Sequence, residues 1–188
     1  MRYIKVKACF RYAPDRLYRV LLVPEQVDLL RLAQIIGESV HVEWEHLFEF
    51  RKGNTRYVLD AEDELGCLFG DMISRPMQDS NISDLGKKAV FEYDFGDGWI
   101  FDIQIYKRTV ERDDEKAAWI LEGAGQGIWE DYIGSLYAYF DGRIDDDYEE
   151  PEDSEYGLPW NFKNKHFSDF DKVLDLAAEQ EHLDERLI

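Results

Sequence analysis

Hydrophobic and polar residues alternate at the beginning of the chain, a pattern typical of a half-buried β-strand. Within residues 3–10, apolar side chains occupy one face of this strand, and Lys5 and Lys7 occupy the other. A turn around Pro14 follows, because proline interrupts strand pairing. The apolar run over residues 17–23 predicts a second strand, so we expect the chain to begin with a hairpin.

The period of the pattern changes after Pro24, a residue that suits the first turn of a helix because its missing N–H leaves no bond unmade. Apolar residues then recur three, four and seven positions apart, at Leu29, Leu32, Ala33 and Ile36. This spacing places them on one face of a helix, which we expect over about residues 25–39.

The most informative pattern spans residues 88–108, where two alternating runs meet at the Gly-Asp-Gly sequence of residues 96–98. A two-residue turn mixes apolar and polar side chains on one face, whereas a three-residue loop over 96–98 makes one face wholly apolar. Since a slip of one residue exchanges the two faces of a strand, we predict the three-residue loop. The apolar face then contains Phe91, Tyr93, Phe95, Trp99, Phe101 and Ile103.

The remaining pattern predicts a hairpin from residues 47–51 and 55–59, a short helix over 132–140, and a helix capped by Ser168 or Asp169 that ends near His182. Hairpins with few helices indicate an α+β fold with a mixed or antiparallel sheet and C-terminal helices. The opening hairpin followed by a helix is compatible with a ubiquitin-like grasp. The length fits a single domain over residues 1–188.

Charge changes the picture of what the protein binds. With 22 basic and 41 acidic residues, the formal net charge is −19, which disfavours direct nucleic-acid contact. It favours basic protein partners, divalent cations or nothing more than solubility, and a solvated surface is the commonest of these. Residues 141–155 contain nine acids and one base, which predicts a solvated, partly disordered loop. No apolar run reaches the length of a membrane span, and the N-terminus has no apolar signal segment. We therefore expect a cytoplasmic protein without membrane contact.

Three carboxylates share the polar face of the long hairpin in the predicted register. Glu92 lies opposite Asp102, and Asp94 lies on the same face. Like charges that face each other destabilise a sheet unless something offsets them. A divalent cation is one candidate, with Glu130 and Asp131 as further ligands if their loop folds back. In so acidic a protein, an exposed face screened by lysines or an arginine is the commoner arrangement.

Familiar catalytic spacings do not occur in the sequence. His41 and His46 are five residues apart, whereas a zinc-binding helix needs a spacing of four. The glycine-rich residues 123–127 lack the lysine of a phosphate-binding loop. No serine lies in a nucleophile elbow, and Cys9 and Cys67 form no CxxC pair. The sequence therefore identifies no catalytic residue and no cofactor.

Several motifs follow one another in an order that spans most of the chain. They are Val23-Pro24, Trp44-Glu45-His46-Leu47, the specific run Tyr93-Asp94-Phe95-Gly96-Asp97-Gly98-Trp99, the glycine-rich segment with Glu130-Asp131, and Trp160 with Phe170-Asp171. Together they resemble the plasmid pRiA4b ORF-3-like family. The resemblance points to these motif or binding residues: Trp44, His46, Tyr93, Asp94, Gly96, Asp97, Trp99, Glu130 and Asp131.

The chain departs from the family pattern at Ile128 and Trp129, where the family typically has a cysteine and a proline pair. No role of that cysteine is therefore carried over. The family has no established biochemical function. Some relatives are labelled as passenger proteins of insertion elements, but this chain offers no nucleophilic serine with an arginine cluster that would support recombination.

Three functional hypotheses follow, in descending order. The first is a non-enzymatic, acidic interaction module for a basic protein partner, with residues 141–155 steering association. The second is a divalent-metal site on the 88–108 hairpin, for which hydrolysis is one chemistry to consider. The third is a role in mobile-element biology through a partner. The sequence does not give the oligomeric state.

Overall fold

A computed structural model of the chain describes residues 1–60, 72–148 and 166–187. The strands are β1 (Arg2–Phe10), β2 (Tyr18–Pro24), β3 (Phe48–Lys52), β4 (Thr55–Val58), β5 (Ile73–Pro76), β6 (Lys88–Tyr93), β7 (Trp99–Glu111) and β8 (Trp119–Ala124). The helices are α1 (Leu29–Ser39), α2 (Ile82–Leu85), α3 (Ile133–Phe140) and α4 (Leu176–Arg186), with a 3-10 helix at Phe167–Asp171.

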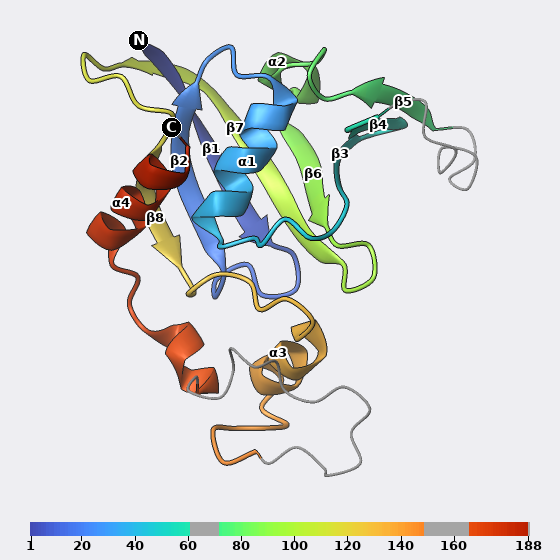
Figure 1. Ribbon diagram of the computed structural model, residues 1–188, viewed down its shortest axis with the longest axis vertical. Coiled ribbons are helices and arrows are strands. Elements are labelled where there is room, and N and C mark those ends of the chain that lie inside the picture. The colour runs from blue at the N-terminus through green and yellow to red at the C-terminus, as the bar shows by residue number, and fades with distance from the viewer. Residues whose placement is uncertain (61–71, 149–165, 188) are drawn as a thin grey trace.

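The described strands form one sheet in the order β5-β4-β3-β6-β7-β1-β2-β8. Every neighbouring pair is antiparallel except β4 and β5, which are parallel. Figure 1 shows α1 lying across one face of this sheet, and α4 contacts both α1 and β8. The predicted α+β class, the helix after the first hairpin and the C-terminal helices are confirmed. Because β1 is antiparallel to both neighbours, the sheet supports no finer assignment to a ubiquitin-like grasp.

Helix α1 begins later than predicted because Asp28, rather than Pro24, precedes its first turn. The Asp28 side chain accepts a hydrogen bond of 2.7 Å from the backbone N–H of Arg31, as an N-cap residue does. The predicted apolar face is confirmed, since Leu29, Leu32, Ala33 and Ile36 are all fully buried. Burying each large apolar side chain contributes about 1.5–3 kcal/mol, so this contact anchors the helix on the sheet.

The C-terminal region divides into two helices where one was predicted. The short 3-10 helix uses Phe167 and Phe170 to reach the core, and α4 begins only after Asp175. The Asp175 side chain caps α4 by accepting bonds from the N–H groups of Ala177 and Ala178. No helix in the described ranges is long and apolar enough to cross a membrane.

The register of the long hairpin differs from the prediction by two residues. Tyr93 pairs with Trp99 and Phe91 with Phe101, so the connecting loop has five residues, 94–98, instead of three. The buried face is as predicted for every member except Phe95, which lies in the loop and is partly exposed. The two-residue shift preserves the face of each strand, which is why the pattern of apolar positions did not distinguish the two registers.

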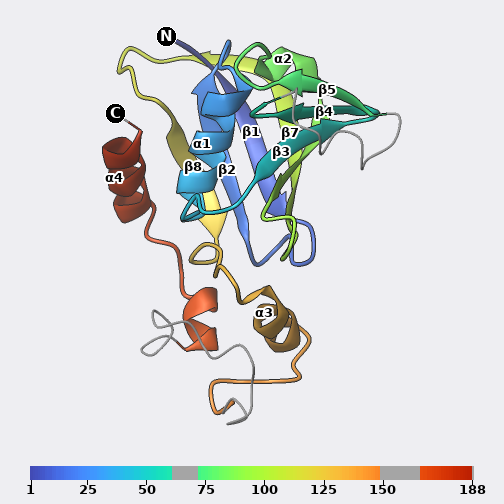
Figure 2. The ribbon, with the colours of Figure 1, turned by 45° about the vertical axis from the view of Figure 1, so that its right-hand side comes forward.

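The opposite face of β1, β6 and β7 stays in contact with solvent. Figure 2 shows α1 and α4 together on one side of the sheet. Side chains that point to the other side, such as Asp102 and Gln104, are exposed, and Lys5 and Lys7 are partly exposed. Part of the predicted acidic loop, residues 149–155, lies outside the described residues, whereas residues 141–148 follow α3.

Candidate functional site

Three loops converge at one end of the sheet. They are residues 41–47 after α1, residues 94–98 between β6 and β7, and residues 125–132 after β8. His46, Asp94 and Asp131 each come from a different one of these loops, and their ligand atoms lie within 4.8 Å of one another. We call these three residues the histidine–aspartate cluster.

Unusual backbone conformations hold the cluster in place. Trp44, Asp94 and Asp131 have φ angles of 63°, 53° and 62°, and they are three of the four non-glycine residues with positive φ in the described chain. This conformation costs roughly 1–2 kcal/mol for an ordinary residue, although aspartate tolerates it better than most. Such strain concentrates at functional sites, so its gathering here supports a functional role for these loops.

Asp94 begins the five-residue loop and organises its backbone. Its own N–H donates to the carbonyl of Leu47 at 2.9 Å, and its side chain accepts from the N–H of Gly96 at 2.9 Å. A Cβ atom at Gly96 would lie only 3.2 Å from the Asp94 carboxylate, so a small residue is needed at that position. The Asp94 side chain is almost fully buried, with Oδ1 at 3.8 Å from Nδ1 of His46.

Glu130 joins two of the three loops. Its carboxylate accepts from the N–H of Glu43 at 2.5 Å and from the hydroxyl of Tyr93 at 3.0 Å, and it lies 3.8 Å from His46. Burial raises the pKa of Glu130, and these hydrogen bonds oppose the rise. Burial and the bond to Glu130 raise the pKa of Tyr93 well above its usual range, which keeps the hydroxyl protonated as a donor. Glu130 is therefore suited to positioning His46.

Asp97 and Trp99 lie where the 94–98 loop ends and β7 begins. Burial raises the pKa of Asp97, and the negative charges of Asp94 and Asp131 raise it further. The Oδ2 atom of Asp97 is buried without a hydrogen-bond partner among the described residues. Trp99 is fully buried and its ring lies 5.2 Å from that of Phe10, so it serves the core.

Trp44 is a support for the site, because its side chain has no metal-ligating atom. Its indole N–H donates to Glu38 at 2.7 Å, and its ring meets the edge of Tyr93 at a centroid distance of 6.2 Å. The ring lies so close to α1 that a Cβ atom at Gly37 would come within 2.5 Å of it. Gly37 thus allows the 41–47 loop to fold onto the helix.

The structure does not bring Glu92, Asp94 and Asp102 together. In the observed register Glu92 faces Ile100 and Asp102 faces Val90, and the positive φ of Asp94 turns it out of the strand. Two arginines, Arg51 on the neighbouring strand β3 and Arg11 directly after β1, offset the two remaining carboxylates. Arg51 pairs with Glu92, and Nη2 of Arg11 lies 2.6 Å from Asp102. Screening by arginine, rather than a cation shared by these three residues, is therefore what the structure shows on the strands.

No lysine or arginine of the described chain forms an ion pair with the carboxylates at the loop end, namely Asp94, Asp97, Glu130 and Asp131. The histidine–aspartate cluster thus combines one imidazole and two carboxylates without a fixed counter-cation. Imidazole suits zinc and iron, and carboxylates also suit manganese and magnesium. Three protein ligands leave coordination positions for water, as in catalytic rather than structural zinc sites.

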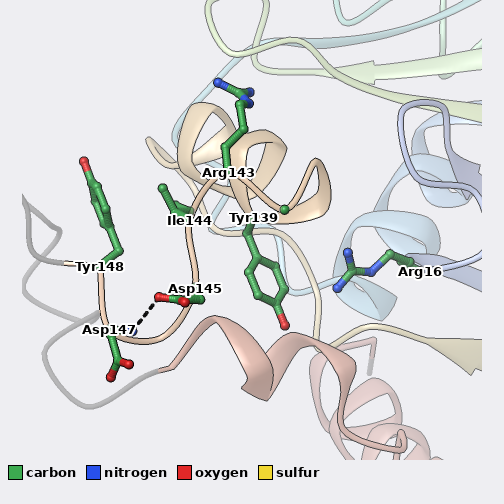
Figure 3. A pocket seen from close by; sticks show the side chains of 8 residues that line it. Arg16, Tyr139, Arg143, Ile144, Asp145, Asp147 and Tyr148 are labelled. Carbon is green, nitrogen blue, oxygen red and sulfur yellow. Dashed lines mark hydrogen bonds between the residues drawn. The ribbon is translucent and has the colours of Figure 1, made fainter.

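Two cavities lie away from the cluster. One, of about 500 Å³, lies beside α3, and Arg16, Tyr139 and Arg143 contribute to its lining (Figure 3). Its two arginines already pair with Asp171 and Asp141. The other cavity, also of about 500 Å³, lies between α1 and the end of α4, and Trp44 separates it from Tyr93. Neither cavity contains a member of the histidine–aspartate cluster.

Comparison with known proteins identifies relatives but no activity. A sequence model of the plasmid pRiA4b ORF-3-like protein family matches residues 2–176. The uncharacterized protein y4hQ of Sinorhizobium fredii is 28% identical over 140 residues, which are 72% of this chain and 69% of that protein. A crystal structure of MM3350, a protein of unknown function from Methanosarcina mazei Go1, has a TM-score of 0.64 at 19% identity, covering 79% of this chain and 84% of that one. This last similarity concerns the fold alone.

Proposed function

From the chain's membership of the plasmid pRiA4b ORF-3-like family, together with the geometry of its loops, we propose that it binds a divalent metal ion through His46, Asp94 and Asp131. The observation that carries the proposal is the convergence of three ligand atoms, from three loops, within 4.8 Å. Two of the three belong to the family's motif segments around residues 94–99 and 130–131, and His46 belongs to a third segment. Motif residues that lie far apart in sequence thus meet at one point.

Electrostatics supports a cation at this point. Asp94 is buried and Asp131 adds a second negative charge nearby, and a buried carboxylate is costly unless it is paired or bound to a metal. On the strands of the same sheet, arginine side chains provide the compensating charge, as in the Glu92–Arg51 pair. At the cluster only His46 is available, and it carries a positive charge only when it is protonated.

The donor set favours a first-row transition metal, with Zn²⁺ and Mn²⁺ as the leading candidates. Asp131 is exposed, so water can reach a bound ion and complete its coordination. A metal with such open positions can lower the pKa of bound water and produce a nucleophile. Metal-dependent hydrolysis is therefore the activity to assay first once binding is established.

Calorimetric titration and thermal unfolding of chelator-treated protein test the proposal. Binding to the folded state alone raises stability, by about 2.7 kcal/mol when the metal concentration is 100 times the Kd. We expect Zn²⁺ or Mn²⁺ to raise the melting temperature, and Asp94→Asn to abolish the rise. Asparagine tolerates positive φ and can still accept the Gly96 bond, so this variant removes charge with little backbone change.

Asp102→Asn is the matched control, because it removes one carboxylate from the same hairpin at a position paired with Arg11. It should leave the metal-induced shift unchanged. An equal shift in wild type and Asp94→Asn, or a shift lost in Asp102→Asn, would contradict the proposed site.

A second proposal is an interaction with a basic protein through the acidic segment that follows α3. Asp145, Asp146 and Asp147 are exposed there, and exposed charge of one sign speeds association with an oppositely charged partner. Affinity capture at low and high salt, with and without residues 141–155, tests this idea. Partners that bind equally well without the segment would remove its proposed role in steering.

A further inference from the structure

Basic residues gather on the uncovered face of the sheet, despite the acidic composition of the chain. Lys5 and Lys7 on β1 and Lys88 on β6 point away from the core, because their neighbours Val6, Ala8 and Ala89 point into it. Three further exposed bases are near in sequence, since Lys87 precedes Lys88, and Lys107 and Arg108 follow Tyr106. Lys107 and Arg108 point to opposite faces because successive side chains of a strand alternate. Within the described ranges none of these six forms an ion pair.

Strand pairing brings these bases close together. Lys88 lies opposite Gln104, and Gln104 lies opposite Lys7, so Lys7 and Lys88 are two strands apart on one row of the face. Neighbouring strands are about 4.8 Å apart, which places the two backbones about 10 Å from each other. Lys5 lies two residues further along β1, or about 7 Å. The result is a compact positive surface.

Aromatic rings accompany the lysines. The ammonium group of Lys5 lies 4.2 Å from the ring centre of Tyr106, and that of Lys7 lies 4.5 Å from the ring centre of Tyr18. Both tyrosines are partly exposed. A positive surface interleaved with aromatic rings on a β-sheet is the combination with which many proteins bind single-stranded nucleic acid, since phosphates meet the cations and bases stack on the rings.

Two carboxylates on this face already have arginine partners, since Asp102 pairs with Arg11 and Glu92 with Arg51. The exposed Glu122 on β8 accepts a hydrogen bond of 2.7 Å from the Tyr18 hydroxyl and forms no ion pair among the described residues, so it offsets part of the positive charge. The lysines Lys5, Lys7 and Lys88 still outnumber it. The net charge of −19 therefore hides a segregated distribution, in which one face is locally positive. The expectation of no direct nucleic-acid contact treated the surface charge as uniform, and this local distribution is the reason to test it.

We propose that the face formed by β1, β6 and β7 binds single-stranded nucleic acid without base-sequence preference. Lys5, Lys7 and Lys88 contact phosphates, and Tyr18 and Tyr106 stack on bases. The flat sheet presents no helix or ribbon that would enter the major groove of a duplex. This inference is independent of the metal site, which lies at the loop end of the same sheet.

Fluorescence anisotropy with a labelled, mixed-sequence single strand of about 16 nucleotides tests the inference. If three phosphates are contacted, log K should fall with log salt with a slope of about −2. The double variant Lys7→Gln/Lys88→Gln should reduce the steepness of that slope by about 1.4. Tyr106→Leu should weaken binding about tenfold, whereas Tyr106→Phe should retain it because the ring is kept.

The matched control is Lys172→Gln/Arg143→Gln, which removes the same charge from surfaces outside this face. It should leave affinity and slope close to wild type, and unchanged melting temperatures will show that all variants are folded. Absence of binding at the lowest salt, or equal losses in the control, overturns the inference. Equally tight binding of a duplex, or of a poly-glutamate peptide, also overturns it and indicates a different polyanion.

Discussion

Carboxylates on the strands of the β6–β7 hairpin have arginine partners, whereas the carboxylates at its loop end do not. On the strands, Glu92 pairs with Arg51 of the neighbouring strand β3, and Asp102 pairs with Arg11, which directly follows β1. At the loop end, Asp94 and Asp97 meet no lysine or arginine of the described chain. Within ten residues of sequence, carboxylates thus change from paired to unpaired.

The difference separates carboxylates that have a fixed arginine partner from those for which we propose a bound cation. An arginine on an adjacent strand is fixed when the sheet forms, so its partner is satisfied without any ligand. The buried Asp94 has no such partner and is held in a strained backbone conformation instead. Charge that the fold leaves uncompensated, rather than charge itself, is what marks the candidate site.

The largest expected effect comes from the most buried of the paired carboxylates. Glu49 is 4% exposed, and it lies 3.2 Å from Arg51 and 2.9 Å from Arg56. Burial raises its pKa, while the two arginines oppose the rise. Glu49→Gln leaves the buried charge of Arg56 without its full partner, so we expect a loss of about 3 kcal/mol or more in urea unfolding.

An exposed residue provides the control for that measurement. Glu111→Gln, at the solvent-exposed end of β7, removes the same charge and should change stability by less than about 0.5 kcal/mol. If the two variants lose similar stability, burial does not determine how much a carboxylate contributes to the free energy of unfolding.

A carboxylate paired with histidine is an intermediate case whose partner depends on pH. Glu179 on α4 lies 3.0 Å from His41, and the rings of His41 and His182 are 4.6 Å apart. Burial raises the pKa of Glu179, but the hydrogen bond and charge of His41 outweigh burial and lower it overall. Burial, and then the charge of His41, lower the pKa of His182.

Both shifts predict that acid loosens α4. A base with a lowered pKa contributes its full stability above its ordinary pKa of 6.5 and loses it as the pH falls towards the folded value. The lowered pKa of Glu179 adds a further loss below its ordinary 4.5. The protection factors of the α4 amides, which correct for the intrinsic pH dependence of exchange, should therefore decrease between about pH 7.5 and about pH 5.5, and less so in His182→Gln. An unchanged pH response in that variant would contradict the role of His182.

The sequence predicted more of the fold than of the site, for a physical reason. Apolar alternation identified the buried faces of β6 and β7 and most of that of β1, because core packing depends on residues two apart. It did not reveal that Asp94 leaves its strand, since that turn depends on a bond from its N–H to the distant Leu47. It also gave no sign that Arg11 and Arg51 would be the partners of Asp102 and Glu92, because only the sheet order brings them together.

Motif resemblance pointed to residues that periodicity could not connect. His46, Asp94 and Asp131 are far apart in sequence, and their separate motifs named all three before the structure placed them within 4.8 Å of one another. This geometry is why we propose the metal site at the loop end of the hairpin and not at the strand carboxylates Glu92 and Asp102.

The smallest expected effect concerns Asp102, because its ion pair with Arg11 is exposed. The side chains of Asp102 and Arg11 are 56% and 46% exposed, so water screens the pair even though its shortest distance is only 2.6 Å. Exposed pairs contribute roughly 0–1 kcal/mol, and we expect Asp102→Asn to lose less than about 0.5 kcal/mol in urea unfolding. A loss as large as that of Glu49→Gln would mean that pairing itself, and not burial, decides which carboxylates the fold depends on. The unpaired state of Asp94 would then be costly enough to be visible in the metal-free protein, and Asp94→Asn would raise its stability without any added metal.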